Sequence, residues 1–321
     1  MLKYKKYVKM LSLLLVSIFG GAYLYVYIYA KSYPIPLFHR ISLDAKMKFV
    51  RDMSDSDKNQ VDTIIVGSSI GLNNIQGAVL EDASEKVKHV LNLSALGLKT
   101  TQVEQLTKLF SLFPNTKRVI YSSQFEDWSG AFVFEDNEVD FAKKYTLLGK
   151  NQIDQTYAFY TFKHLIEFAK NHWKWKKKYA NNNTNHGLLF DHTGSVPLDM
   201  FGENINHKMF VTPPVDTRLF KEDDHALEKM IEDLQTKNIK FYFVAEPYRQ
   251  FMLDKYDDVR NARKNYIQKT EEITTKYSGK FIDLHKKLHL GDEYFADREH
   301  LNSNGSVLTA KEVGAFIDTS E

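Results

Sequence analysis

Short apolar runs alternate with amphipathic segments along most of this chain beyond residue 60. Five runs have the length and β-prone composition of buried strands: Thr63–Val66, His89–Leu93, Arg118–Ser122, Lys240–Val244 and Lys280–Leu284. Three segments repeat apolar residues every three or four positions, as helices with one buried face do: Thr101–Phe113, Asp224–Thr236 and Val259–Tyr277. This alternation predicts a parallel sheet covered on both faces, a three-layer α/β/α sandwich.

The alternation stops between Phe125 and Glu222. This region is rich in aromatic residues, and its middle part, Asn151–Tyr179, is predicted to be helical. The stretches "NNNTNHG" and "DHTGSVPLD" that follow are polar and typical of turns. We interpret residues 125–222 as a mostly helical insertion that shapes or covers a site in one domain, residues 61–321.

The longest apolar run lies near the N-terminus. Met10–Ala30 contains no charged residue, and as a helix it would extend about 31 Å, enough to cross a membrane. Lysines precede this run, so the positive-inside rule places the N-terminus in the cytoplasm and the chain beyond Lys31 outside. Four tyrosines gather at the outer end, as in an interfacial aromatic belt: Tyr23, Tyr25, Tyr27 and Tyr29.

A cleaved signal peptide is the alternative to an anchor. Cleavage after Ala30 would place the bulky Ile28 at position −3, whereas cleavage after Ala22 is chemically acceptable but exposes an apolar new terminus. The sequence favours an uncleaved anchor over residues 1–30 and a polar stalk over residues 31–60. It predicts a single-pass protein of the bacterial cytoplasmic membrane, with the lipid bilayer as a partner and the main domain outside.

The composition of the chain excludes several classes of function and site. The chain has 321 residues and a formal net charge of +2, which gives no general argument for nucleic-acid binding. It has no cysteine, so disulfides, thiolate metal sites and a cysteine nucleophile are excluded. His186, His192 and His207 lack any recognised ligand spacing, so neither a metal site nor a cofactor is predicted.

The first predicted strand runs into Gly67-Ser68-Ser69-Ile70-Gly71. A strand-to-helix turn with glycine on either side of a serine can expose its hydroxyl as a nucleophile. The same residues also suit a simple exit turn in which a serine caps the next helix. Functional sites of parallel sheets form at the carboxyl ends of the strands, and Ser69 lies at such an end.

A nucleophilic serine needs a base, and the base needs an orienting group. Asp297 and His300 stand three residues apart in "FADREHLNSNG", on a predicted loop before the last helix. Taken alone, they suit a surface pair or a helix cap better than a catalytic role. A triad with Ser69 accounts for both motifs and their placement together. An α/β-hydrolase elbow fits less well, because several strands precede it and its acid comes from a separate loop.

The segments "VGSSIG" and "DREHLN…G" resemble the first and last signature blocks of the SGNH/GDSL hydrolase superfamily. The matching positions are Gly67, Ser69, Asp297, His300, Asn302 and Gly305. Ser68 replaces the aspartate of the family, and this Gly-Ser-Ser form is similar to membrane-anchored branches such as DltD-type proteins and polysaccharide O-acetyltransferases. The resemblance implies the flavodoxin-like SGNH fold.

The resemblance also implies an oxyanion hole. Its donors would be the backbone N–H groups of Ser69 and Gly97, with the Gln124 amide in place of the family's asparagine. Trp128 and Arg249 are candidate substrate contacts, although a structural salt bridge is an equal alternative for Arg249.

Together these features predict a membrane-anchored serine acyltransferase that modifies a cell-envelope glycan or teichoic acid through an acyl-serine. A membrane partner, such as a membrane-bound O-acyltransferase, would deliver the acyl group. The choice of transfer over hydrolysis rests on the resemblance and the location, because the triad itself does not distinguish them. Two alternatives stay open: a carbohydrate esterase of the same fold, and a degenerate module that binds glycan or scaffolds an assembly.

Overall fold

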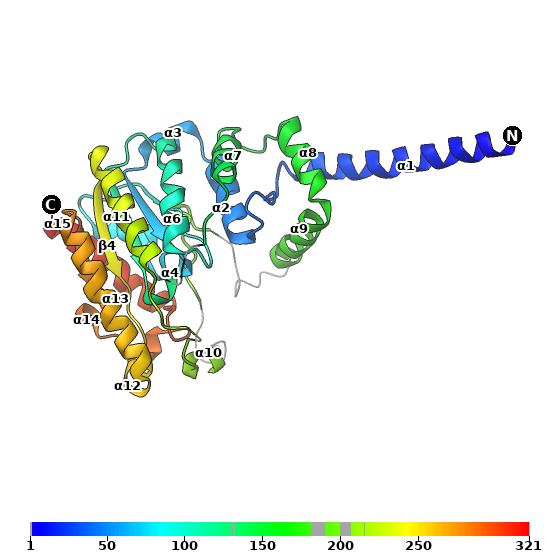
Figure 1. The fold of residues 1–321 in the computed structure, drawn as a ribbon. Helices are drawn as coiled ribbons and strands as arrows, with labels where there is room; N and C mark the ends of the chain where they lie inside the picture. The colour runs from blue at the N-terminus through cyan, green and yellow to red at the C-terminus, as the bar shows by residue number, and fades with distance from the viewer. Residues whose placement is uncertain are drawn as a thin grey trace. The chain divides into compact units, whose positions relative to one another are not determined.

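The computed structural model describes residues 2–128, 130, 132–180, 190–199, 207–214 and 216–320. Their contacts divide the chain into two compact units (Figure 1). The first unit comprises residues 1–54 and 140–182, and the second comprises residues 55–139 and 183–321. Residues of the predicted insertion therefore occur in both units.

The second unit is built on a five-stranded parallel sheet with the strand order β2-β1-β3-β4-β5. The strands are β1 (Thr63–Gly67), β2 (Val90–Asn92), β3 (Arg118–Ser123), β4 (Lys240–Ala245) and β5 (Lys280–Asp283). All five predicted strands are confirmed. This order is that of flavodoxin-like sheets, in which the chain changes direction between β1 and β3 and leaves a crevice at their carboxyl ends.

Helices cover both faces of the sheet, which confirms the predicted α/β/α sandwich. One face carries α6 (Thr100–Leu106), α11 (Lys221–Thr236) and α13 (Asp257–Lys276). The other carries α4 (Ser69–Asn74), α5 (Gly77–Ala83), α14 (Leu284–Leu288) and α15 (Ser303–Ser320). Shorter elements complete the unit: α3 (Asp55–Gln60), η1 (Thr107–Leu112), η2 (Phe125–Asp127), α10 (His207–Val211), α12 (Gln250–Lys255) and η5 (Asp292–Tyr294).

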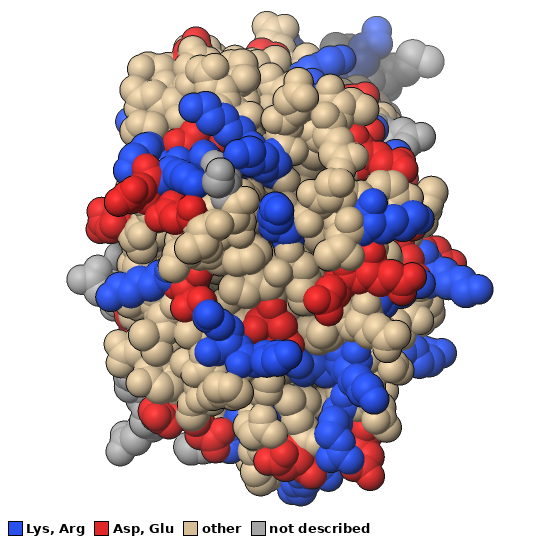
Figure 2. Space-filling view, turned by 90° about the vertical axis from the view of Figure 1, so that its left-hand side faces the viewer, with Lys and Arg blue, Asp and Glu red and all other residues tan. Residues whose placement is uncertain are grey.

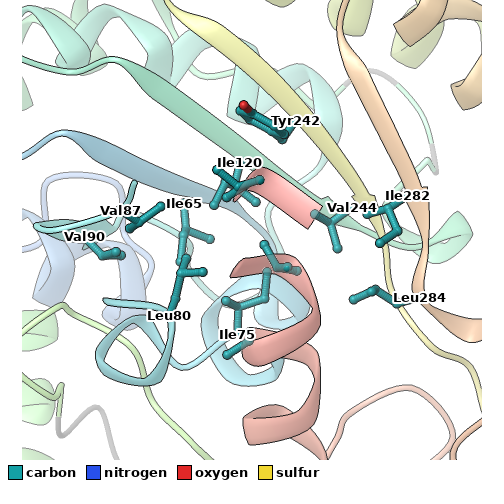
Figure 3. Packing of buried hydrophobic residues seen from close by; sticks show 13 residues of the cluster. Ile65, Ile75, Leu80, Val87, Val90, Ile120, Tyr242, Val244, Ile282 and Leu284 are labelled. Atoms are coloured by element: carbon teal, nitrogen blue, oxygen red, sulfur yellow. The ribbon is translucent and has the colours of Figure 1, made fainter. Parts of the chain in front are cut away.

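Alternate strand residues supply the two apolar layers, as expected from the two-residue period of a strand. Figure 3 shows the layer against α5 and α15, where strand residues such as Ile65 and Ile120 meet helix residues such as Leu80. On the opposite face, Phe243 packs edge-on against Tyr121 with ring centroids 5.3 Å apart. Burial on both faces explains why the strands have nearly continuous apolar sequences.

The first unit contains α1 (Leu2–Tyr29), α2 (Ile41–Asp52), α8 (Gln155–Lys163) and α9 (Leu165–Ala180), and α7 (Asp136–Thr146) crosses the boundary between the units. Within α1, Tyr4–Tyr29 is long and apolar enough to cross a membrane. A signal sequence would meet the same criterion, so α1 is a candidate anchor by length and composition.

The segment predicted as a polar stalk contains α2 and α3. Arg51 of α2 is fully buried. Its guanidinium donates to the Tyr145 hydroxyl at 2.7 Å and to the Lys31 carbonyl at 2.7 Å. These acceptors offset the cost of burying the charged guanidinium of Arg51. The composition of residues 31–60 did not indicate such a buried charge.

Charged side chains of both signs are interspersed over the face drawn in Figure 2. Lysine and arginine side chains lie next to aspartate and glutamate side chains there. The presence of both signs agrees with the net charge of +2.

Candidate active site

The turn between β1 and α4 places Ser69 at the carboxyl edge of the sheet. Gly67 has a φ of +156°, and a Cβ there would lie 2.2 Å from the carbonyl oxygen of Ser122 on β3. Ser68 is the N-cap of α4, since its Oγ accepts the N–H of Ile70 at 3.1 Å. The two interpretations of this motif thus fall on adjacent residues: Ser68 caps the helix, and Ser69 stands in its first turn.

Ser69, His300 and Asp297 form a continuous chain of hydrogen bonds. The Oγ of Ser69 lies 2.8 Å from Nε2 of His300, and Nδ1 of His300 lies 2.9 Å from Oδ2 of Asp297. The Asp297 carboxylate also accepts the backbone N–H groups of Glu299 and His300, at 2.9 and 2.8 Å. This arrangement can remove a proton from a serine as it attacks a carbonyl carbon.

The surrounding charges favour the protonated form of His300. Burial by itself would lower the pKa of His300, but the Asp297 carboxylate, together with Glu299 and Glu126, raises it to about 9. Burial would likewise raise the pKa of Asp297, yet His300 and the backbone donors lower it below its usual value. Asp297 is therefore ionised, and its carboxylate stabilises the imidazolium form of His300.

Two buried amides hold the loop that carries the acid and the base. The side-chain N–H groups of Asn74 and Gln124 both donate to the Glu299 carbonyl, at 3.2 and 3.0 Å. Asn74 also accepts the N–H of Leu301 at 2.9 Å. Since Asn74 lies on α4 with Ser69, one helix positions the nucleophile and fastens the loop of its base. Asn74 was not among the predicted site residues, because "GLNNI" gives no distinctive signal.

An ion pair fixes the same loop from a third side. Arg298 donates through Nε and Nη2 to the two oxygens of Glu126, at 2.9 and 2.7 Å. The Tyr248 hydroxyl adds a third hydrogen bond to Glu126 at 2.9 Å. This two-point pairing is strongly directional. It therefore holds Arg298, which follows Asp297 in the chain, against Glu126 of η2. In the sequence, only the charges of "DREH" indicated that this loop forms an ion pair.

The side-chain amide of Gln124, predicted as the third oxyanion donor, is engaged by two backbone carbonyls. Its Nε2 donates to the Glu299 carbonyl and, at 2.9 Å, to the Pro247 carbonyl. A primary amide has two protons, and both are directed at these oxygens. Its role in the structure is to join the loops after β3 and β4 to the loop that carries His300.

Gly97 lies in the loop that follows β2. The N–H of Ala95 donates to the Gly67 carbonyl at 3.3 Å, which holds this loop against the end of β1. Gly97 is exposed and has a φ of +69°, a left-handed conformation that favours glycine. The oxyanion roles of the Ser69 and Gly97 N–H groups stay predictions.

The two predicted substrate contacts are engaged within the protein. Arg249 is buried and forms a two-point ion pair with Asp292, with N···O distances of 2.8 and 2.7 Å. Trp128 is 0% exposed and packs edge-on against Tyr266, with ring centroids 5.7 Å apart. Arg249 therefore forms the structural salt bridge considered as its alternative role, and Trp128 lies in the core of the described structure.

Among the described residues, two groups of histidine and carboxylate side chains bring their donor atoms within 4.8 Å of one another. One is Asp297 with Glu299 and His300, where the triad already uses both ring nitrogens of His300. The other is His39 with His164 and Glu167, in which Nδ1 of His39 lies 2.6 Å from Oε2 of Glu167. Of the predicted loop histidines, His192 pairs with Glu81, and His186 lies outside the described residues.

No protein-family model and no curated protein matches this sequence. Among solved structures, a suggested acylhydrolase from Bacteroides fragilis is 11% identical, with a TM-score of 0.39 over 82% of this chain and 90% of that one. A catalytic mutant of Axe2, an acetylxylan esterase from Geobacillus stearothermophilus, is 11% identical, with a TM-score of 0.41 over 81% of this chain and 94% of that one. Similarity at this level is too low to show a shared activity.

Proposed function

We propose that this protein is a serine acyl-transfer enzyme of the SGNH/GDSL type. The observation that supports the proposal is the 2.8 Å contact between Ser69 Oγ and His300 Nε2, with Asp297 behind the imidazole. The order of the three residues along the chain and the flavodoxin-like sheet agree with the resemblance of the two sequence motifs to that superfamily.

In the proposed reaction, His300 takes the proton of Ser69 while the serine oxygen attacks the carbonyl carbon of an acyl ester. The backbone N–H groups of Ser69 and Gly97 would stabilise the oxyanion that forms. Collapse of the tetrahedral intermediate releases the donor alcohol, to which His300 returns the proton, and leaves an acyl-serine. A hydroxyl of an acceptor, or water, then attacks the acyl-serine by the reverse sequence.

We favour a glycan or teichoic acid of the cell envelope as the acceptor, with α1 as an uncleaved anchor and the second unit outside the membrane. The support is the length and composition of Tyr4–Tyr29 and the lysines that precede it. A membrane-bound O-acyltransferase would then supply the acyl group on the outer side. Hydrolysis of an acylated carbohydrate by the same triad is the alternative reaction.

A non-catalytic glycan-binding module is the second candidate function. The engagement of the Gln124 amide favours it, because it leaves two candidate donors for the oxyanion where three were expected. Loss of one such donor typically costs about 3 kcal/mol of transition-state stabilisation, which slows an enzyme without abolishing its attack on a reactive ester.

Labelling with a fluorophosphonate distinguishes these functions. We expect the intact protein to be labelled, and Ser69→Ala and His300→Ala to prevent labelling. Ser111→Ala, which removes an exposed hydroxyl elsewhere, serves as the matched control. An unlabelled intact protein would favour the binding module. Transfer requires that an added glycan accelerate p-nitrophenol release from a short-chain ester and become acylated, whereas an unchanged rate with free acid as the product indicates an esterase.

A further inference from the structure

In the first unit, α8 and α9 pack beside the C-terminal part of α1 (Figure 1). Phe162 at the end of α8 meets Phe19 and Tyr23 edge-on, with ring centroids 6.4 and 5.8 Å apart. On α9, His172 lies 2.5 Å from the Tyr25 hydroxyl through its Nδ1. The α8–α9 hairpin (residues 155–180) is thus fastened along the last turns of α1.

These contacts fix the depth of the hairpin, given the anchoring role proposed for α1. Tyr4–Tyr29 has 26 residues, about 39 Å as a helix, whereas the hydrocarbon core needs only about 20 residues. The tyrosines that begin at Tyr23 mark the outer interface, so the core lies over about residues 4–23 instead of Met10–Ala30. Lys5, Lys6 and Lys9 then extend their side chains to the inner headgroups. Phe162 meets α1 at that boundary, so the hairpin lies at the outer interface.

The hairpin exposes large apolar side chains that α1 does not cover. Ile166 is 74% exposed and Trp173 is 64% exposed. They are seven residues apart on α9 and therefore share a face, about 100–120° around the helix from His172. Phe159 of α8 is 54% exposed as well. At this depth, side chains that α1 does not cover meet lipid instead of bulk water.

Exposed lysines accompany these apolar side chains. Lys163 lies over the ring of Phe159, with its Nζ 4.9 Å from the centroid. Lys170 and Lys174 of α9 are exposed and lie about 40° and 80° around the helix from Ile166. Long basic side chains beside an apolar line suit an interfacial helix, because their stems cover apolar surface while their ammonium groups reach anionic headgroups.

We propose that the α8–α9 hairpin is a second membrane contact, which inserts Phe159, Ile166 and Trp173 into the outer interface of an anionic bilayer. This inference rests on the anchoring in the proposed function. The hairpin would prevent the first unit from turning freely about the axis of α1, since a single helix restrains depth but not rotation.

Spin labels on single cysteines test the proposal, because the chain has no native cysteine. The full-length protein is labelled at Ile166→Cys or Trp173→Cys and placed in nanodiscs of phosphatidylcholine, with or without phosphatidylglycerol. Leu13→Cys, on an exposed position of α1, is the lipid reference, and Gln155→Cys, at the exposed start of α8, is the water reference.

We expect the labels at Ile166 and Trp173 to be several-fold less accessible to a water-soluble nickel reagent than the label at Gln155, and readily accessible to oxygen. Combining Lys170→Gln and Lys174→Gln should raise nickel access at Ile166 only in discs with phosphatidylglycerol. If the nickel reagent reaches the labels at Ile166 and Trp173 as readily as the label at Gln155, the proposal is overturned. That result would favour a protein partner or a second copy on this face. High nickel accessibility of the label at Leu13 would instead overturn the anchoring role of α1 and, with it, this inference.

Discussion

Glu299 offers a sharp test of the electrostatics around the triad. Its carboxylate contributes to the raised pKa of His300, whereas its backbone carbonyl is the atom that Asn74 and Gln124 hold. Glu299→Gln removes the charge and keeps the carbonyl. Losing a negative charge destabilises the imidazolium, so the pKa of His300 falls. Because the neutral imidazole is the base, the pH–activity profile moves to lower pH.

The size of this shift follows from the separation of the groups. The donor atoms of Glu299 and His300 lie within 4.8 Å of one another. Two unit charges at that separation interact by about 3 kcal/mol at an effective dielectric constant of about 20, equivalent to roughly two pH units. Burial, and after it the charge of Glu126, raises the pKa of Glu299 itself to about 8. Glu299 is therefore ionised over only part of the pH range of the activity profile. We therefore expect a downward shift of about one pH unit.

The rate of fluorophosphonate labelling, measured between pH 5 and pH 10, supplies the profile without needing the natural substrate. Glu293→Gln makes the same chemical change at an exposed position six residues away and should leave the profile in place. A profile that stays fixed or moves upward in Glu299→Gln, with labelling retained, would refute the assignment of His300 as a base tuned by this carboxylate.

Three further variants test the framework of the site. Asp297→Asn should slow labelling by about 10⁴-fold, because the imidazole loses the partner that orients and charges it, and circular dichroism should show an unchanged fold. Asn74→Ala should lower the free energy of unfolding by about 1–3 kcal/mol in urea titrations and should slow labelling. The reason is that the Leu301 N–H loses its acceptor and the Glu299 carbonyl loses one of its two donors. Unaltered stability would contradict the proposed role of Asn74 in holding the loop. Gly67→Ala should destabilise the protein by more than about 4 kcal/mol, because its methyl group would overlap the Ser122 carbonyl, and soluble protein with a wild-type melting temperature would exclude this close approach.

The sheet was predictable because burial on both faces leaves continuous apolar runs in the sequence. The pairing of Ser69 with His300 was predictable for a different reason: both sit next to recognisable turns, and parallel strands bring their carboxyl ends to one edge. These inferences use local pattern and topology alone. They do not require knowing where any other side chain points.

The environment of the site could not be predicted in the same way. Gln124 stands at the expected place after β3, but two carbonyls from distant loops capture its amide, and sequence spacing contains no information about them. Trp128 and Arg249 suggested surface contacts by residue type, yet packing against Tyr266 and pairing with Asp292 decided their positions. The burial of Arg51 likewise depends on acceptors far along the chain.

The 231 positions that separate Ser69 from His300 have a consequence for the timing of reactivity. A ribosome has made most of the polypeptide before the imidazole exists, so the nascent serine stays an ordinary alcohol throughout synthesis. In the proposed mechanism, its nucleophilic character would arise only once α15 docks and the preceding loop closes on Asn74. Assembly from opposite ends would therefore delay the proposed chemistry until folding is complete, with no need for a separate inhibitor or propeptide.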